Sequence, residues 1–352
     1  MRILFVKLSS IGDIVHTLPT LAAIKKALPD SDISWVAEKN SAEILRNNSL
    51  LSHLIEVDTK TLRRRNVLGK TIQTAKTQLR ELRASEFDLT IDFQGLLKSA
   101  SIAKLVKTKK RFGFSKRNLR ESSSRILMSD SIDVEPVQNI VFKNIELAEN
   151  SLRIYLSDES FSLDRNNIEF PVSTLVEHKR EAEVIVEEAG GKFAILNPAG
   201  GWPTKLWHAD KFGMLADMLW ENLGLRSVVS TAPNESDLAN KAISASESGK
   251  AIIAQPSLKG FYELAKLAAV YIGGDTAPTH LAAAAKCPVV GIFGPTEWWR
   301  NGTTDPRDIC VERNDIDCRV NCHRRSCDKW ICMNIPVETV FDAVRNRLNI
   351  DT

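Results

Sequence analysis

The sequence predicts an α/β protein with two doubly wound domains, each built around a parallel sheet. Its 352 residues exceed what one hydrophobic core usually holds and are enough for two. Short apolar runs alternate with amphipathic helical patterns in both halves, which is typical of parallel sheets covered on both faces. We expect ligands to bind where the carboxyl ends of strands meet helix amino termini, in a cleft between the domains.

The first half of the chain opens with an apolar run. Residues 2–8 have the length and composition of a buried parallel strand. Residues 18–28 then repeat apolar side chains at helical spacing, and Pro29 ends that helix. Further strands are predicted at 33–37, 54–57 and 87–92, and further helices at 70–83, 96–106 and 137–152. The polar segment 157–167 is the predicted linker, which gives a first domain of residues 1–165.

The second half repeats this architecture without repeating the sequence. Strands are predicted at 193–197, 227–230, 251–254, 270–273 and 289–293, and helices at 209–223, 235–246, 258–266 and 278–286. The predicted second domain covers residues 166–335. The last helical pattern, within residues 336–352, is expected to pack back on the first domain.

Positive charge is concentrated in one part of the chain. The net charge is +3 overall, but residues 60–125 hold 18 Lys and Arg against 5 Asp and Glu, a net of +13. So uneven a segment predicts an anionic partner rather than only a solvated face. Phospholipid head groups and an anionic glycolipid satisfy this charge. Nucleic acid is disfavoured, because no recognised nucleic-acid module and no aromatic interleaving accompanies the basic residues.

The sequence predicts neither a membrane span nor a secretion signal. No run of about 18 apolar residues is present. The first residues read as a strand with charged neighbours rather than as a signal peptide. We therefore expect a cytoplasmic protein whose six cysteines are reduced.

A turn rich in small residues follows the first strand. Residues 7–16 read K-L-S-S-I-G-D-I-V-H, and Gly12 lets the backbone turn tightly between strand and helix. Asp13 then falls in the first turn of the helix, where a carboxylate either serves chemistry or only caps the helix. The G-x-G-x-x-G fingerprint of dinucleotide-binding enzymes is absent, so a dehydrogenase is disfavoured.

Two further loops in the second half suit a phosphate group. In residues 273–284, G-G-D-T-A-P-T-H-L-A-A-A, a strand runs into a helix start whose free N–H groups and dipole favour an anion. His280 either donates to a diphosphate oxygen or is a structural residue. In residues 197–207, N-P-A-G-G-W-P-T-K-L-W, Lys205 either neutralises a leaving diphosphate or is a surface lysine. Residues 294–296 would add another backbone edge to the same pocket.

Together with residues 92–100, D-F-Q-G-L-L-K-S-A, these motifs resemble the bacterial lipopolysaccharide heptosyltransferases, glycosyltransferase family 9. The resemblance extends from Met1 to about Thr304 and is strongest to the type I members. K-x-S-S-x-G-D-x-x-H-T-L-P and D-x-Q-G-L-x-K-S-A are specific in combination, whereas D-T-x-P-x-H-L-A-A marks the wider family. The resemblance implies a GT-B fold of two Rossmann-like domains, an ADP-heptose donor, and inversion at the anomeric carbon with no catalytic metal or other cofactor.

The resemblance also implies roles for individual residues. Asp13 would be the general base that removes the proton of the acceptor hydroxyl. Lys205 and the helix start at Thr276 would stabilise charge on the departing ADP. Asp275 would cap that helix and hold a sugar hydroxyl, and Glu235 would bind the ribose. The implied donor contacts are Ser10, Gly12, Ala199, Gly200, Lys205, Glu235, Asp275, Thr276, Ala277, His280, Gly294 and Thr296.

The implied acceptor contacts lie in the first domain. They are Ser9, Ser10, Gln94, Lys98 and Arg120. The implied acceptor is Kdo of a lipid A inner-core precursor in lipopolysaccharide biosynthesis, reached at an anionic membrane surface on the inner face of the inner membrane. A second heptose or a protein side chain is an alternative acceptor. Non-catalytic binding of a nucleotide sugar is an alternative function, and the presence of all the implied catalytic residues argues against it.

The chain departs from the family pattern at two places. Ala277 stands where many relatives carry Gly, and one added methyl group near the diphosphate can alter the fit of the donor. The loop at residues 197–202 is rich in glycine where the type I enzymes tend to carry threonines.

A group of cysteines lies near the carboxyl terminus, just after Cys310. Four thiols within fifteen residues of a cytosolic chain suggest a structural zinc or iron ion before they suggest disulfides. The paired C-x2-C spacing of common zinc sites is missing, so reduced, partly buried thiols are the alternative. We expect no catalytic role for the four, which are Cys318, Cys322, Cys327 and Cys332.

Overall fold

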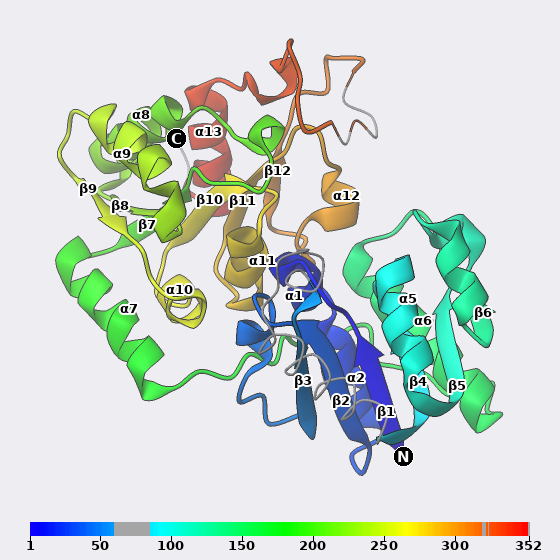
Figure 1. The fold of residues 1–352 in the computed structure, drawn as a ribbon. Coiled ribbons are helices and arrows are strands. Elements are labelled where there is room, and N and C mark those ends of the chain that lie inside the picture. Colours follow the sequence, from blue (N-terminus) through cyan, green and yellow to red (C-terminus); the bar gives the residue numbers. More distant parts are fainter. Residues whose placement is uncertain (60–84, 319–321, 323, 351–352) are drawn as a thin grey trace, which may run out of the picture. The chain divides into compact units, whose positions relative to one another are not determined.

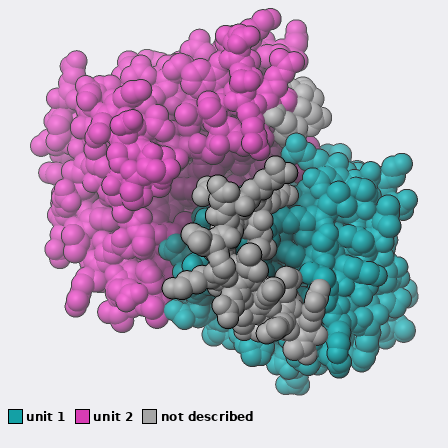
Figure 2. Space-filling model, in the orientation of Figure 1, with its two compact units in different colours: residues 1–173 teal, residues 174–352 magenta. Residues whose placement is uncertain are grey.

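The computed structural model describes residues 1–59, 85–318, 322 and 324–350. The chain divides into two compact units, Met1–Ser173 and Thr174–Thr352 (Figures 1 and 2). The predicted helix at residues 70–83 lies outside the described residues. Among the described residues, no helix combines the length and the apolar character that crossing a lipid bilayer requires.

The first unit contains a sheet of six parallel strands in the order β3-β2-β1-β4-β5-β6 (Figure 1). Its central strand, β1, is fully buried from Ile3 to Val6, because helices cover both faces of the sheet. The strands are β1 (Arg2–Val6), β2 (Asp32–Glu38), β3 (His53–Val57), β4 (Glu86–Asp92), β5 (Lys107–Phe114) and β6 (Asp130–Ile132). The helices are α1 (Ile11–Val15), α2 (Leu18–Ala27), α5 (Leu97–Leu105) and α6 (Ile140–Leu156), with 3-10 turns η1 (Ala42–Leu45), η2 (Lys116–Asn118) and η3 (Ser122–Leu127).

Strand β5 is absent from the sequence prediction because its first residues, K-T-K-K-R, are basic. Cross-strand ion pairs explain why these residues form a strand. Lys107 and Lys109 lie 3.7 and 2.6 Å from Glu86 and Asp88 of β4, and a further lysine pairs with β6. Opposite charges on neighbouring strands stabilise the sheet. Part of the positive charge of residues 60–125 is therefore neutralised within the sheet itself.

The second unit contains six parallel strands in the order β12-β11-β10-β7-β8-β9. The strands are β7 (Phe193–Asn197), β8 (Arg226–Ser230), β9 (Ala251–Ala254), β10 (Val270–Gly274), β11 (Val289–Ile292) and β12 (Ile309–Val311). The helices are α7 (Val176–Ala189), α8 (Ala209–Leu223), α9 (Ser236–Ser244), α10 (Leu258–Ala265), α11 (Ala277–Ala284), α12 (Trp298–Asn301) and α13 (Val337–Arg347), with 3-10 turns η4 (Pro203–Lys205), η5 (Pro233–Glu235) and η6 (Ile331–Met333).

Helix α13 differs from its expected placement on the first domain. It packs against α8, β11 and β12 within the second unit. Val337, Val340, Phe341 and Val344 follow helical spacing and join the buried core of that unit. The apolar face of α13 is therefore buried within the second unit.

The segment expected to link the domains is instead bound to the first unit. Glu149 of α6 accepts a hydrogen bond from the backbone N–H of Leu163 at 2.9 Å and pairs with Arg165 at 3.1 Å. The division between the units falls later, at Ser173. A buried carboxylate needs donors and a cation, and Glu149 finds both in this segment.

Both sheets reverse their strand order at one point, between β1 and β4 in the first unit and between β7 and β10 in the second. Loops that leave adjacent strands at such a point diverge to opposite faces of the sheet, and ligands of open α/β sheets bind beside the strand carboxyl ends there. In this chain, four motifs of the sequence lie at the carboxyl ends of β1, β4, β7 and β10. They are residues 7–16, 92–100, 197–207 and 273–284, respectively.

Candidate active site

Asp13 lies in the first turn of α1, immediately after β1. Its Oδ2 accepts hydrogen bonds from the backbone N–H of Ser10 at 2.8 Å and from the Ser10 hydroxyl at 2.9 Å. Lys7 Nζ lies 3.8 Å from Oδ1, and 41% of the Asp13 side chain remains exposed. The carboxylate therefore caps its helix and is still open to a substrate.

The surroundings of Asp13 keep it ionised. Burial would raise its pKa, but the charge of Lys7, the backbone N–H of Ser10 and the charge of His16 outweigh burial and lower the pKa below its ordinary value. At neutral pH the group is a carboxylate that can accept a proton.

Gln94 fixes the loop that leads from β1 to the helix of Asp13. Its Oε1 accepts the backbone N–H groups of Leu8 and Ser9 at 3.1 and 3.2 Å. The backbone N–H of Gln94 in turn donates to Asp92 Oδ1 at 2.9 Å. The predicted acceptor contact Gln94 thus ties the loops after β1 and β4 together through its carbonyl oxygen. Its amide nitrogen donates to no atom of residues 1–59 or 85–350 that the structure describes.

Asp92 is a buried carboxyl at the same switch point. Burial raises its pKa to about 6, although the backbone N–H groups of Gln94 and Gly95, the hydroxyl of Ser99 and the charge of Lys7 lower it. The folded protein therefore binds a proton here more tightly than the unfolded chain, in which an Asp pKa is about 3.9.

This pKa makes stability depend on pH. The contribution of Asp92 is fully present below about pH 4 and is lost as the pH rises through about 6. Asp92→Asn removes the titration and keeps an acceptor for the two N–H groups. We expect the free energy of unfolding of the variant, relative to the unmodified protein, to increase by roughly 2 kcal/mol between pH 4 and pH 7. Urea unfolding at both pH values measures this difference.

An exposed aspartate supplies the control for this comparison. Asp237→Asn, on the surface of α9, removes one carboxylate without touching the Asp92 site. A difference between Asp92→Asn and the unmodified protein that stays the same at both pH values would contradict the prediction.

The two basic residues predicted to contact the acceptor differ in their surroundings. Lys98, on α5, pairs with the buried carboxylate of Glu38 at the end of β2. Glu38 also accepts from the hydroxyl of Thr59. Arg120 is exposed, and its side chain has no hydrogen bond or ion pair within the described part of the chain. Arg120 is thus available to an anionic ligand, whereas the charge of Lys98 is already balanced.

The second switch point gathers a charged cluster around Asp275. Lys205 Nζ lies 2.7 Å from Asp275 Oδ2, and His280 Nε2 lies 3.3 Å from Oδ1. Asn301 Nδ2, from α12, donates to Oδ2 at 3.2 Å. The Lys205 and Asp275 side chains are 13% and 6% exposed. The structure thus brings together three residues predicted from two separate motifs and adds Asn301, which the sequence analysis missed.

The surroundings of Asp275 correct one expectation. The cap position of α11 is held by Thr276 rather than by Asp275. Burial would raise the pKa of Asp275, but the hydrogen bond from His280 and the charge of Lys205 hold it well below its usual range. A buried carboxylate is stable only beside a cation, so Asp275 turns toward Lys205 and does not cap the helix.

Unpaired polar atoms mark the carboxyl edge of the second sheet. Asn197 Oδ1 at the end of β7, Thr231 Oγ1 after β8 and Thr296 Oγ1 after β11 are buried and have no hydrogen-bond partner among the described residues. Buried polar groups are nearly always satisfied by protein, water or ligand. A polar ligand or a bound water molecule would satisfy these three oxygens. Thr296 was predicted from the sequence, and Asn197 and Thr231 were not.

The remaining predicted donor contacts lie in loops of the same edge. Gly200 is closely packed, because a Cβ there would lie 3.0 Å from Leu206 and 3.4 Å from Thr276. Gly294 leaves room for the side chains of Met333 and Cys332. Ala199 lies in the loop after β7, Glu235 lies in the turn η5, and Ala277 is the first residue of α11. In the first unit, Gly12 is buried within α1.

Known proteins of similar sequence identify the family of this chain. Residues 76–330 match the family described as glycosyltransferase family 9 (heptosyltransferase). The chain belongs to glycosyltransferase family 9. Lipopolysaccharide heptosyltransferase 1 of Pseudomonas aeruginosa is 27% identical, over 99% of this chain and 92% of that protein. Lipopolysaccharide heptosyltransferase 1 of Campylobacter coli is 26% identical, over 86% of each.

A solved structure shows the same fold. E. coli heptosyltransferase WaaC with ADP superimposes with a TM-score of 0.74 at 23% sequence identity, covering 88% of this chain and 93% of that one. The GT-B class predicted for this glycosyltransferase is confirmed. The two six-stranded parallel sheets of this chain have the same strand order as each other.

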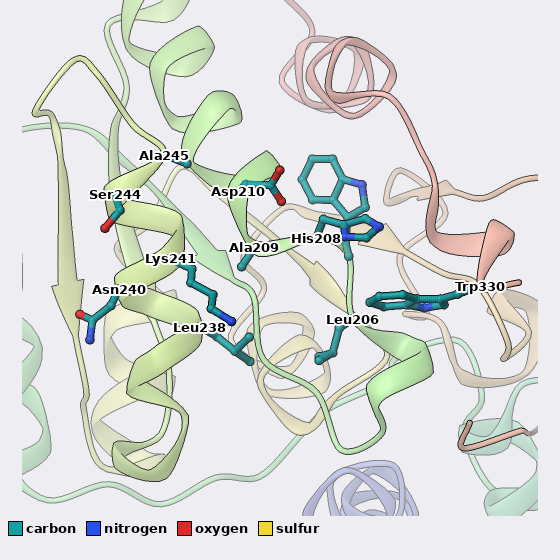
Figure 3. Close-up of a pocket in the computed structure, with 11 residues that line it drawn as sticks. Leu206, His208, Ala209, Asp210, Leu238, Asn240, Lys241, Ser244, Ala245 and Trp330 are labelled. Atoms are coloured by element: carbon teal, nitrogen blue, oxygen red, sulfur yellow. The ribbon is translucent and has the colours of Figure 1, made fainter. Parts of the chain in front are cut away.

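A cavity of about 610 Å³ adjoins the Lys205 loop of the glycosyltransferase (Figure 3). Its walls come from the start of α8, from one side of α9 and from Trp330. None of the predicted donor contacts lines it, so we do not place the diphosphate there. The lining residues are Leu206, Trp207, His208, Ala209, Asp210, Leu238, Asn240, Lys241, Ser244, Ala245 and Trp330.

The cysteines predicted to hold a metal are all free thiols. Within the described residues, no three Cys, His, Asp or Glu side chains are arranged to hold a metal ion. Burial raises the pKa of Cys332, and the neighbouring thiols of Cys322, Cys318 and Cys327 add to this. The structural metal stays a prediction from sequence, which metal analysis of the purified protein decides.

Proposed function

We propose that this family 9 glycosyltransferase transfers heptose from ADP-heptose to Kdo of a lipid A inner-core acceptor in lipopolysaccharide biosynthesis. The observation that carries the proposal is the kind of side chain found at each of the two switch points. An ionised, open carboxylate, Asp13, follows β1, and a buried cluster of Lys205, Asp275 and His280 follows β7 and β10. Solved structures of similar fold include E. coli WaaC with ADP and with ADP-2-deoxy-2-fluoro heptose.

The chemistry follows from these groups. The acceptor hydroxyl oxygen attacks the anomeric carbon while Asp13 takes its proton. The bond between the anomeric carbon and the β-phosphate oxygen breaks, and its electron pair leaves with ADP. Lys205 and the free N–H groups at the start of α11 stabilise the charge on that oxygen. Attack opposite the leaving group inverts the anomeric centre.

The proposed choice of acceptor rests on the charge of the protein surface and on the names of the relatives. Arg120 and its exposed neighbours Lys116 and Arg125 lie on and around η2 and η3 and favour an anionic acceptor. Several relatives are named lipopolysaccharide heptosyltransferase 1, whereas others are named heptosyltransferase 3 or 2. A heptose-bearing acceptor is therefore the second candidate, and a protein side chain fits the basic surface less well.

The site of action is proposed to be the anionic inner face of the inner membrane. Ile126, 77% exposed on η3, stands among these basic residues, a combination that suits a lipid head-group surface. Electrostatic attachment of this kind weakens as salt screens the charges.

ADP release by the purified protein tests the proposal. ADP-heptose is supplied with Kdo-bearing lipid A in anionic vesicles, with a heptosylated acceptor, or with neither. We expect release that requires the Kdo acceptor, falls as salt is raised, and persists in EDTA. Release only with the heptosylated acceptor would replace the acceptor assignment, and failure to bind ADP-heptose would overturn the donor assignment.

A further inference from the structure

The segment after the cysteine-rich region packs on the loop that carries Lys205. The Thr204 hydroxyl donates to the backbone carbonyl of Arg324 at 2.6 Å. Trp330 Nε1 donates to the backbone carbonyl of Thr204 at 3.1 Å, and the Trp330 and His208 rings lie 4.8 Å apart. These contacts anchor the segment at both ends, so the residues between them are held against the loop.

Arg325 and Lys205 share one aromatic ring. Lys205 Nζ lies 4.5 Å from the centre of the Trp202 ring, and the guanidinium carbon of Arg325 lies 5.2 Å from the same centre. Both distances are within the range of cation–π attraction. Arg325 is exposed, and its guanidinium has no hydrogen bond or ion pair within the described residues. Among the described residues, Arg325 is therefore a cation without a counter-charge that shares the Trp202 ring with Lys205.

The charge of Lys205 alone is insufficient for a diphosphate. Lys205 Nζ lies 2.7 Å from the Asp275 carboxylate, and both side chains are largely buried, so the carboxylate offsets most of the ammonium charge. A departing nucleoside diphosphate carries more than one negative charge, which this balanced pair does not neutralise. The site needs a further cation, and the guanidinium fork matches phosphate oxygens in geometry.

We propose that Arg325 is a diphosphate-binding residue, the second cation of the leaving-group site, positioned by Trp202 and supplied by the carboxyl-terminal segment. This inference rests on the proposed nucleotide-sugar donor. It assigns a function to a segment outside the family motifs described above.

Calorimetric binding of ADP and of adenosine tests the assignment. Arg325→Ala is compared with Arg324→Ala, which removes the same charge one residue away and keeps the backbone carbonyl that Thr204 binds. We expect Arg325→Ala to weaken ADP binding about tenfold, Arg324→Ala to change it less than twofold, and adenosine binding to change in neither variant. Unchanged thermal unfolding of both variants shows that the loop remains folded.

Other outcomes separate the two proposals. If the unmodified protein binds ADP and the two arginine variants bind it equally well or equally poorly, Arg325 is not a specific diphosphate contact, and the donor assignment stands. Equal losses for ADP and adenosine would make Arg325 structural. If the unmodified protein binds no ADP, both proposals fail.

Discussion

Replacing Asp13 by Asn is expected to lower kcat for heptose transfer about a thousandfold while ADP affinity stays unchanged. An amide cannot take the proton of the acceptor hydroxyl. It can still accept the hydrogen bonds that Ser10 donates to Oδ2, so helix α1 keeps its cap. Steady-state ADP release gives kcat, and calorimetry gives the ADP affinity.

Ser10→Ala is the matched control for this variant. It removes one of the hydrogen bonds that lower the pKa of Asp13 and leaves the carboxylate in place. We expect its kcat to fall less than tenfold and the acidic limb of its pH profile to move to higher pH. A kcat for Asp13→Asn close to that of the unmodified protein would exclude Asp13 as the base.

Lys205→Ala is expected to have two large effects. The value of kcat/KM should fall by about two to three orders of magnitude, since a preorganised charge on the leaving group is lost. The free energy of unfolding should fall by about 3 kcal/mol, because the buried carboxylate of Asp275 loses the cation at 2.7 Å. Donor kinetics and urea unfolding measure the two effects separately.

A double variant separates catalysis from stability. Lys205→Met with Asp275→Asn removes both charges, so the stability lost in Lys205→Ala should largely return while kcat/KM stays low. If the double variant recovers activity as well, the role of Lys205 is only to balance Asp275. If Lys205→Ala keeps the stability of the unmodified protein, the pair is not coupled as the structure indicates.

Sequence patterns predicted the central strands well and the basic or highly charged elements poorly. Buried parallel strands are uninterrupted apolar runs, so β1 and β7 were evident. Strand β5 was not, because its lysines are stabilised only by carboxylates that the fold brings opposite them. Helix α7 was also missed, since few of its residues, among them Ala182 and Ile185, are buried.

The site was predictable only where a motif follows a strand. Asp13, Lys205 and Asp275 lie in motifs of this kind, so their types and positions indicated chemistry. Asn301 comes from a short helix far along the chain, and only the fold reveals that it reaches Asp275. The buried oxygen of Asn197 became informative only when the fold showed that no described residue donates a hydrogen bond to it. Contacts between distant segments leave no local pattern in a single sequence.

The shared strand order of the two sheets has a consequence for how this family diversifies. In the proposed mechanism, the same geometric position serves proton removal in one unit and phosphate binding in the other. If that mechanism holds, substitutions around β1 and β4 would change the choice of acceptor while the donor site is kept, and substitutions around β7 and β10 would do the reverse. Because the acceptor preference and the donor preference would change separately, one fold could give rise to enzymes that use one donor on different acceptors.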